Sequence, residues 1–290
     1  MHARPRAIVL GGQPGAGKSA MQGAAEQELL PRGGALSIVG DDLRAYHPRY
    51  AELLGRDDKT AAFYTDRDSG RWVEKLIAYA REQKFDVVIE GTMRLPDKVA
   101  QTFIDLRSAG YKVQARVLAV RAEFSELGIR QRYEQFLADR GHARFTTPRA
   151  HQAAYEGLPA SLARIERERL ADAVRLYARG NVLLYANRQA DGVWQAAPKG
   201  VDTLHEIRTR VFAPSEKAEL ALGWHRVWTT MEARGAAAAE LEQVRPMREA
   251  AFVRLHSDWR AVDDFRAQVD AQTFLETKRL GRAVDRGLGR

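Results

Sequence analysis

Short apolar runs alternate with amphipathic stretches along the first 120 residues of the chain. In each run the hydrophobic residues follow one another directly, which is typical of strands buried on both faces. The stretches between the runs carry apolar residues at helical spacing. This alternation predicts an α/β fold with a doubly wound parallel sheet. The expected strands are residues 6–12, 35–40, 85–91 and 111–120, and the expected helices are residues 18–30, 67–84 and 95–110.

The pattern changes after residue 120. Residues 124–141 and 159–171 carry helical patterns and predict a helical lid. Three short strands within residues 174–197 predict a small β extension. Its last two strands should be joined by an Asp191-Gly192 turn, because this dipeptide favours a tight hairpin.

The chain is helical again after about residue 200. We therefore expect a first domain over residues 1–200 and a C-terminal helical appendage over residues 201–290. Large apolar side chains recur at helical spacing in this appendage, which is typical of a core between antiparallel helices. The side chains expected to be buried there are Trp224, Trp228, Phe252 and Trp259.

Composition narrows the class of protein. The chain has 290 residues, of which 45% are hydrophobic and 29% charged, as in soluble globular proteins. No apolar run approaches the roughly 20 residues of a membrane span, so no membrane association is expected. The N-terminus runs directly into the first strand, so we do not expect a secretory signal. The sequence contains no cysteine, which excludes disulfides and thiolate chemistry and is compatible with the expected cytoplasmic location.

The formal net charge is +8, and nearly all of the excess lies in residues 1–200. Such an excess is either a solvated basic surface or a cleft for small polyanionic molecules. Nucleic acid is not an expected partner, because no run of Lys and Arg with interleaved aromatic residues is present.

The strongest motif lies between the first expected strand and the first expected helix. Gly12, Gly17, Lys18 and Ser19 have the spacing of a phosphate-binding loop, whose backbone N–H groups surround the β- and γ-phosphates of a nucleotide. Lys18 should reach the phosphate oxygens, and the Ser19 hydroxyl should be a ligand of Mg²⁺. The predicted nucleotide-binding residues are Gly12, Gln13, Pro14, Gly15, Ala16, Gly17, Lys18 and Ser19.

Acidic residues follow two of the expected strands. Asp41 and Asp42 come at the carboxyl end of the second strand, where open α/β sheets bind ligands. A kinase needs a carboxylate to accept or orient the proton of the acceptor hydroxyl, and either aspartate could do so while the other caps the next helix. Glu90 ends a strand that should be buried, so its carboxylate should be paired, associated with a metal ion or directed at a substrate hydroxyl.

A segment rich in arginine lies in the expected lid. Guanidinium groups suit the charge of a phosphoryl group in transfer, and at least one arginine of this segment should be catalytic. The candidates are Arg130, Arg132, Arg140 and Arg144. His47 and His151 are single loop histidines, and we expect them to form hydrogen bonds rather than a metal site.

Together these motifs resemble the zeta toxin family of bacterial toxin–antitoxin systems. The segments GGQPGAGKS, DDLRAYHP and VVIEGTMR occur in family order within about residues 7–190. The resemblance implies a fold similar to small P-loop kinases. It also implies a toxin that uses ATP or GTP with Mg²⁺ to phosphorylate the 3′-hydroxyl of the amino sugar in UDP-N-acetylglucosamine, which blocks use of this cell-wall precursor. A small antitoxin is the implied protein partner, and it inhibits by blocking the nucleotide site.

The resemblance also assigns roles to residues. It makes Asp41 the base and leaves the capping role to Asp42. Glu90 matches a glutamate that contacts the substrate sugar, and the same motif places Thr92 and Arg94 in the predicted substrate site. Arg132 and Arg144 match the arginines of the lid. The implied catalytic residues are Asp41, Lys18, Arg132 and Arg144.

Three features depart from the family pattern, one of which is a spacing between Arg144 and Pro148 that is one residue longer than in the family. His151-Gln152 stands where the family has His-Asp, and the tail after Gly200 has no counterpart in the short members. We therefore expect the tail to contribute nothing to nucleotide binding, so a chain that ends near Gly200 should still bind ATP.

Two other functions stay open. One is a kinase of the same fold with another nucleotide-sugar, a dinucleotide or a polynucleotide as acceptor. The other is a nucleotide-binding interaction protein with little turnover, against which the complete set of lysine, aspartate and arginine candidates argues.

Overall fold

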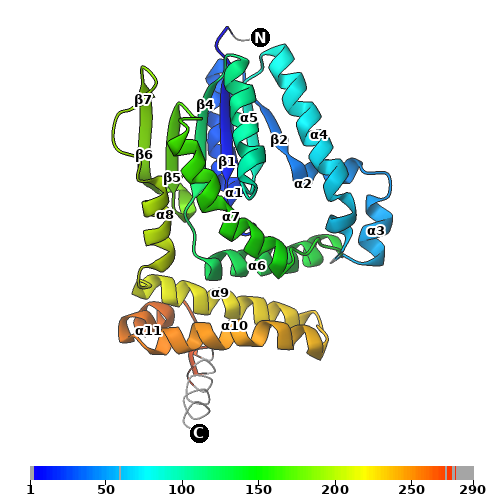
Figure 1. Cartoon of the computed structure of the whole chain (residues 1–290). Helices are drawn as coiled ribbons and strands as arrows, with labels where there is room; N and C mark the ends of the chain where they lie inside the picture. Colours follow the sequence, from blue (N-terminus) through cyan, green and yellow to red (C-terminus); the bar gives the residue numbers. More distant parts are fainter. Residues whose placement is uncertain (1–2, 59, 272, 276–277, 279–290) are drawn as a thin grey trace. The chain divides into compact units, whose positions relative to one another are not determined.

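The structure is a computed structural model that describes residues 3–58, 60–271, 273–275 and 278 of the chain (Figure 1). The chain forms two compact units. The first comprises residues 1–129 and 140–209, and the second comprises residues 130–139 and 210–290.

The first unit is built on a seven-stranded sheet in the order β2-β3-β1-β4-β5-β6-β7. The first five strands of this order run parallel, and β6 and β7 are antiparallel additions at one edge. The strands are β1 (Arg6–Gly11), β2 (Leu36–Val39), β3 (Val87–Gly91), β4 (Lys112–Leu118), β5 (Ala173–Tyr177), β6 (Leu183–Ala190) and β7 (Val193–Trp194).

Helices cover both faces of the parallel strands, which confirms the doubly wound α/β class. Ala7 and Val9 of β1 pack into a core with the helices of one face. Because side chains alternate along a strand, Ile8 and Leu10 point to the opposite face, where α1 (Lys18–Leu29) packs on β1. The helices that contribute to the first core are α4 (Ala61–Gln83), α5 (Pro96–Ser108), α7 (Pro148–Arg167) and α8 (Gly200–Thr209).

The register of the parallel strands brings their carboxyl ends to one edge. Glu90 of β3 is level with Leu10 of β1 on one side and with Val39 of β2 on the other. The phosphate-binding loop, the start of α2 (Gly40–Leu43) and the loop after β3 therefore begin side by side. This edge of the sheet is where open α/β folds place ligands.

The segment after residue 120 contains the expected lid helices and β extension. α6 (Ala122–Arg140) matches its prediction, whereas α7 begins at Pro148 rather than near Pro159. Pro148 occupies the first turn after the capping residue Thr147, whose side chain accepts a hydrogen bond from the Ala150 N–H. The expected Asp191-Gly192 turn is confirmed, since both residues have positive φ and β6 pairs with β7 across them.

The second unit consists of residues 130–139 of α6 together with three helices. These are α9 (Pro214–Ala233), α10 (Ala238–His256) and α11 (Trp259–Arg266). Trp224 and Phe252 are buried as expected, and the Phe252 and Phe265 rings contact each other edge to face. The prediction for Trp259 is wrong, because α10 ends at His256 and Trp259 starts a new helix with its side chain 73% exposed.

The helical pattern expected after residue 200 begins with α8, whereas several short helices elsewhere were not expected. α8 packs Leu204 into the core of the first unit. The expected domain boundary at residue 200 stays a prediction. The unexpected helices are α3 (Tyr50–Arg56) and the 3₁₀ turns Leu30–Arg32 and Arg179–Asn181. The helix expected after Asp42 forms as α2 followed by the 3₁₀ turn Arg44–Tyr46.

None of the helices in the described part of the chain combines the length and the apolar character that a membrane crossing requires. The cytoplasmic location stays a prediction.

Candidate active site

The phosphate-binding loop connects β1 to α1. Gly17 caps α1 with a φ of 97°, and Gly15 has a φ of 77°. A Cβ atom on Gly15 would lie 1.9 Å from the backbone oxygen of Ser125, so no side chain fits between the loop and α6. Gly12, Gln13 and Ala16 are buried, Pro14 and Gly15 are half-buried, and Ser19 is exposed in the first turn of α1.

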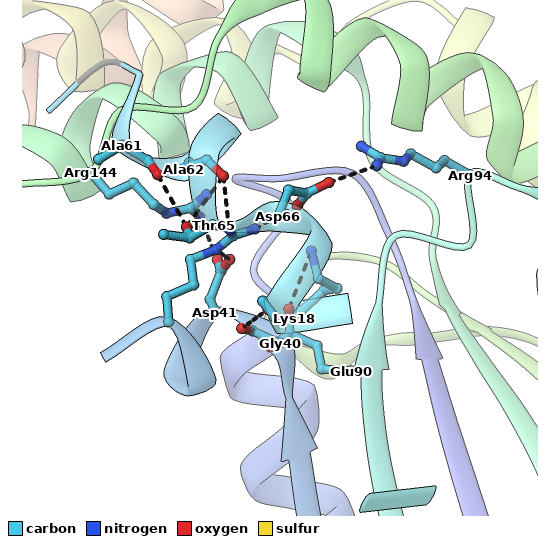
Figure 2. Close-up of polar contacts among 12 residues, drawn as sticks. Lys18, Gly40, Asp41, Ala61, Ala62, Thr65, Asp66, Glu90, Arg94 and Arg144 are labelled. Carbon is cyan, nitrogen blue, oxygen red and sulfur yellow. Dashed lines mark hydrogen bonds and ion pairs between the residues drawn. The ribbon is translucent and has the colours of Figure 1, made fainter. Parts of the chain in front are cut away.

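Lys18 lies across this loop. Its Nζ donates to the backbone oxygens of Gly12 at 2.9 Å and Gln13 at 3.2 Å. The same atom lies 3.6 Å from Oε1 of Glu90 (Figure 2). The structure thus pairs the half-buried carboxylate at the end of β3 with the loop lysine, which is one of the three alternatives that the sequence left open for Glu90.

Asp41 lies at the start of α2 and contacts two arginines, of which Figure 2 labels Arg144. Arg44 Nε is 3.2 Å from its Oδ1, and Arg144 Nη2 donates to its Oδ2. Arg144 comes from the segment before α7, so residues more than a hundred positions apart meet at this carboxylate. The structure therefore brings together the base and one of the lid arginines that the resemblance implies.

Asp42 does not have the capping role expected of it. The capping position of α2 is Val39, and no side chain caps this helix. Burial raises the pKa of Asp42 above its usual value, and the negative charge of Asp41 raises it further. The two neighbouring aspartates thus differ in environment, since Asp41 has two guanidinium partners.

A network around Arg44 was not foreseen from the sequence. Arg44 is buried, and its guanidinium donates to the Ala62 backbone oxygen, to Thr65 Oγ1 at 2.8 Å and to Asp66 Oδ1 at 2.7 Å. Asp66 in turn lies 3.5 Å from Arg94 Nη2 (Figure 2). The network connects the start of α4 to both Asp41 and the loop after β3. Only the i, i+3 spacing of Asp41 and Arg44 could have signalled part of it.

Thr92 and Arg94 lie in the loop after β3. Thr92 is half-buried, and the Arg94 side chain is about 38% exposed beside Asp66. Ser161 of α7 donates to the backbone oxygen of Met93 between them, which ties the loop to the helix. Arg94 therefore lies in a fixed loop next to the network that carries Asp41.

The remaining arginine candidates lie on α6. Arg132 belongs to the part of this helix that joins the second unit, and its role at the phosphate site stays a prediction. Arg130 is buried in the same segment, 3.8 Å from Glu134. Burial lowers the pKa of Arg130, while Glu134 opposes the change. Arg130 is thus part of the packing of the second unit.

The donor set is compatible with a magnesium ion that arrives with a nucleotide. No group of three or more His, Cys, Asp or Glu side chains in the described residues could hold a metal ion by itself. Mg²⁺ in nucleotide sites takes most of its ligands from phosphates and water, with one or two from the protein. The exposed hydroxyl of Ser19 at the start of α1 can supply such a ligand.

These residues can support chemistry on a phosphate. The loop offers backbone N–H groups and Lys18 for a polyphosphate, while Asp41 offers a carboxylate for an incoming hydroxyl. Arg144 places a positive charge at the same point, where negative charge develops during phosphoryl transfer.

Comparison with known proteins finds relatives that share one family description. The family model described as Zeta toxin matches residues 1–190. Toxin zeta of Streptococcus agalactiae is 34% identical over 190 residues, which are 65% of this chain and 66% of the relative. This chain therefore covers just under two thirds of that relative.

A second relative and a solved structure extend the similarity beyond residue 190. Toxin PezT of Streptococcus pneumoniae serotype 4 is 29% identical over 230 residues, covering 79% of this chain and 88% of the relative. The solved structure of the PezAT chromosomal toxin–antitoxin system of Streptococcus pneumoniae matches with a TM-score of 0.68 and 27% identity. The match covers 80% of this chain and 89% of the chain in the solved structure, which supports the P-loop kinase-like fold.

Proposed function

Because the chain belongs to the zeta toxin family, we propose that it is a kinase that phosphorylates the 3′-hydroxyl of the amino sugar in UDP-N-acetylglucosamine. ATP or GTP is the donor. The observation that carries the proposal is the convergence of Lys18, Glu90 and the Asp41–Arg144 pair at the carboxyl edge of the sheet. A phosphate-binding loop alone would serve many reactions, whereas a carboxylate and an arginine beside it suit transfer to a hydroxyl.

In the proposed reaction the acceptor hydroxyl oxygen attacks the γ-phosphorus. The bond between the γ-phosphorus and the β–γ bridging oxygen breaks, the nucleoside diphosphate leaves, and the hydroxyl proton passes to Asp41. Lys18, Arg144 and Arg132 balance the charge on the transferred group. Mg²⁺, when bound with the nucleotide and Ser19, neutralises phosphate charge.

The proposed acceptor contacts come from the end of β3 and the loop after it, and β3 lies between the strands that lead to the phosphate-binding loop and to Asp41. Glu90, Thr92 and Arg94 are the proposed sugar-nucleotide contacts, and Arg44 with Asp66 keeps Arg94 and Asp41 in place. Two polyanionic substrates at one site also suit the positive charge of residues 1–200. The proposed outcome in a cell is toxicity through loss of a cell-wall precursor, and a small antitoxin is the proposed partner.

The test is a reaction panel. The protein is incubated with Mg·ATP or Mg·GTP and each of several UDP-sugars, and products are analysed by mass spectrometry. We expect UDP-N-acetylglucosamine to gain one phosphoryl group, and the Lys18→Ala variant to give no product and to lose any growth inhibition on expression. Nucleotide binding without phosphorylation of any UDP-sugar would overturn the proposed acceptor. Growth inhibition that survives Lys18→Ala would overturn the proposed link between transfer and toxicity.

A further inference from the structure

Arg208 is a residue of α8 that reaches the phosphate-binding loop. It lies after residue 190, where the family match ends. Its Nη2 donates to Gln13 Oε1 at 3.3 Å, and its Nη1 donates to the Tyr155 backbone oxygen at 2.8 Å. The guanidinium carbon lies 3.7 Å from the centroid of the Tyr155 ring. A residue from the tail, for which the sequence predicted no part in nucleotide binding, thus contacts the loop.

Gln13 is the residue that joins this contact to the loop. Its side chain is fully buried, and its Nε2 donates to the Val120 backbone oxygen at 2.9 Å and to Ser125 Oγ at 3.2 Å. Its own backbone oxygen accepts hydrogen bonds from the Ala16 N–H and from Lys18 Nζ. The position of the Gln13 side chain therefore fixes the carbonyl on which Lys18 rests.

The two sides of the Gln13 amide have opposite requirements. The Val120 carbonyl can only accept, so it must face the amide NH₂, whereas a guanidinium can only donate, so it must face the amide oxygen. Arg208 thereby excludes the flipped orientation, in which the NH₂ group would point at a cation.

The neighbouring histidine completes the arrangement. His151 Nε2 lies 2.7 Å from Ser125 Oγ, and the His151 ring stacks near Tyr155. Burial lowers the pKa of His151, and the charge of Arg208 lowers it further, so the neutral imidazole is favoured. Ser125 is thus fixed by a neutral partner while it accepts from Gln13.

If Arg208 had only a structural role, its burial would lower the stability of the fold. Burial lowers its pKa, and its buried Nε has no hydrogen-bond partner among the described residues. A half-buried guanidinium with an unsatisfied donor costs free energy that an apolar side chain of similar length would avoid. The hydrogen bond from Arg208 to Gln13 suggests a functional reason for keeping an arginine here despite this loss of free energy.

We propose that Arg208 is a positioning residue for the nucleotide site, which acts by fixing the Gln13 amide and, through it, the loop and Lys18. This role rests on the proposed function, because it requires that the loop bind the nucleotide. α8 is then part of the catalytic unit.

The test compares two buried arginines in the full chain. Arg208→Met keeps an unbranched apolar chain over Tyr155 but removes the donors. Arg116→Met is the matched control, because Arg116 is buried on β4 and pairs with Glu28 and Gln114. We measure the Kd for Mg·ATP by calorimetry, kcat, and the melting temperature of each variant.

We expect Arg208→Met to weaken Mg·ATP binding by roughly 5- to 20-fold, in the range of one charge-assisted hydrogen bond. The Arg116 variant should lose melting temperature but keep its affinity. In a Gln13→Met background, replacing Arg208 should have no further effect on affinity, since both changes remove the same contact.

Unchanged affinity in Arg208→Met would overturn the positioning role, as would equal losses in the two arginine variants or additive losses in the double variant. An unsubstituted chain that binds neither ATP nor GTP would instead overturn the proposed function itself.

Discussion

At the residue scale, Asp41 and Asp42 are adjacent carboxylates with different partners. Asp41 contacts Arg44 and Arg144, whereas burial and the charge of Asp41 raise the pKa of Asp42. Arg144 meets Asp41 and not Asp42, so position rather than basicity makes Asp41 the proposed carboxylate that orients and accepts the proton of the hydroxyl.

The first prediction separates these two residues. Asp41→Asn keeps the size of the side chain but cannot accept the proton, so turnover should fall by roughly 10²- to 10⁴-fold. ATP affinity should stay close to that of the unsubstituted chain. Asp42→Asn is the control and should retain turnover. Steady-state kinetics and calorimetry check both, and a loss of turnover in the Asp42 variant alone would reverse the assignment.

The second prediction concerns His151 and pH. Because its folded-state pKa lies below the ordinary value of 6.5, the unfolded chain takes up the proton first as the pH falls. His151 therefore contributes stability that is complete above about pH 6.5 and is lost as the pH drops through the folded-state pKa.

The His151→Gln variant checks this sign. Its amide can keep a hydrogen bond to Ser125 but does not titrate. Urea denaturation at a series of pH values should show that the unsubstituted chain loses stability below about pH 6.5 relative to this variant. A stability difference that is constant with pH would contradict the prediction.

The residues of the site differ in how far the sequence reveals them. Lys18 and Ser19 follow from local spacing, and Glu90 and the pair of Asp41 and Asp42 follow from their place at strand ends. The choice of Asp41 over Asp42 came only from the resemblance to the family. The Arg44–Asp66–Arg94 network joins three segments through tertiary contacts. No local pattern encodes such contacts, so this part could not be predicted.

At the element scale, α6 packs directly on the phosphate-binding loop. A Cβ atom on Gly128 would lie 2.3 Å from the backbone oxygen of Gly15. The helix and the loop thus approach each other through two glycines, and neither backbone can accept a side chain without moving.

The third prediction follows from this contact. Gly128→Ala should displace the loop and weaken Mg·ATP binding by roughly tenfold or more, with a loss of about 1–3 kcal/mol in the free energy of unfolding from overpacking. Gly23→Ala is the matched control, since Gly23 lies in α1 with no atom within 4 Å of an added Cβ. It should raise stability by about 0.5–1 kcal/mol and leave affinity unchanged. Equal ATP affinities in the two variants would show that the contact does not shape the loop.

Hydrophobic periodicity predicts that a helix is present more reliably than it predicts the residues at which the helix begins and ends. α1 and α5 were predicted within two residues at each end, because glycine and proline mark their limits. α7 contains Pro148 and Pro159, and a helix could begin at either of them. Only the side-chain cap of Thr147 shows that the helix begins at Pro148. Trp259 kept helical spacing from Phe252, although the helix ends between them.

At the scale of the whole molecule, one helix contributes to two units. Residues 130–139 of α6 group with residues 210–290, although the helix itself is continuous. Glu134 and Arg234 show the reason, since they pair across 100 positions of sequence. The spacing of apolar residues along a helix does not reveal a partner so far away in the sequence. The sequence therefore predicted only a single domain boundary near residue 200.

The pair between Glu134 and Arg234 is bidentate and largely buried. Arg234 Nε lies 2.6 Å from Glu134 Oε2, and its Nη2 lies 3.1 Å from Oε1. The Glu134 side chain is only 3% exposed, so its carboxylate depends on protein partners rather than on water. Glu240 also contacts Arg234, but with a single bond of 3.1 Å at a more exposed position.

The fourth prediction uses this difference. Arg234→Met should lower the free energy of unfolding by about 3 kcal/mol, because it leaves a buried carboxylate without its main partner. Glu240→Ala should cost less than about 1 kcal/mol, as is typical of exposed pairs. The Glu134→Met/Arg234→Met double variant should be more stable than Arg234→Met alone, since it also removes the buried carboxylate that Arg234→Met leaves without its main partner. Urea denaturation of these four chains and of the Glu134→Met single variant checks the order. A double variant that loses the sum of both single changes would mean that the two residues act independently, and that other contacts keep residues 130–139 in the second unit.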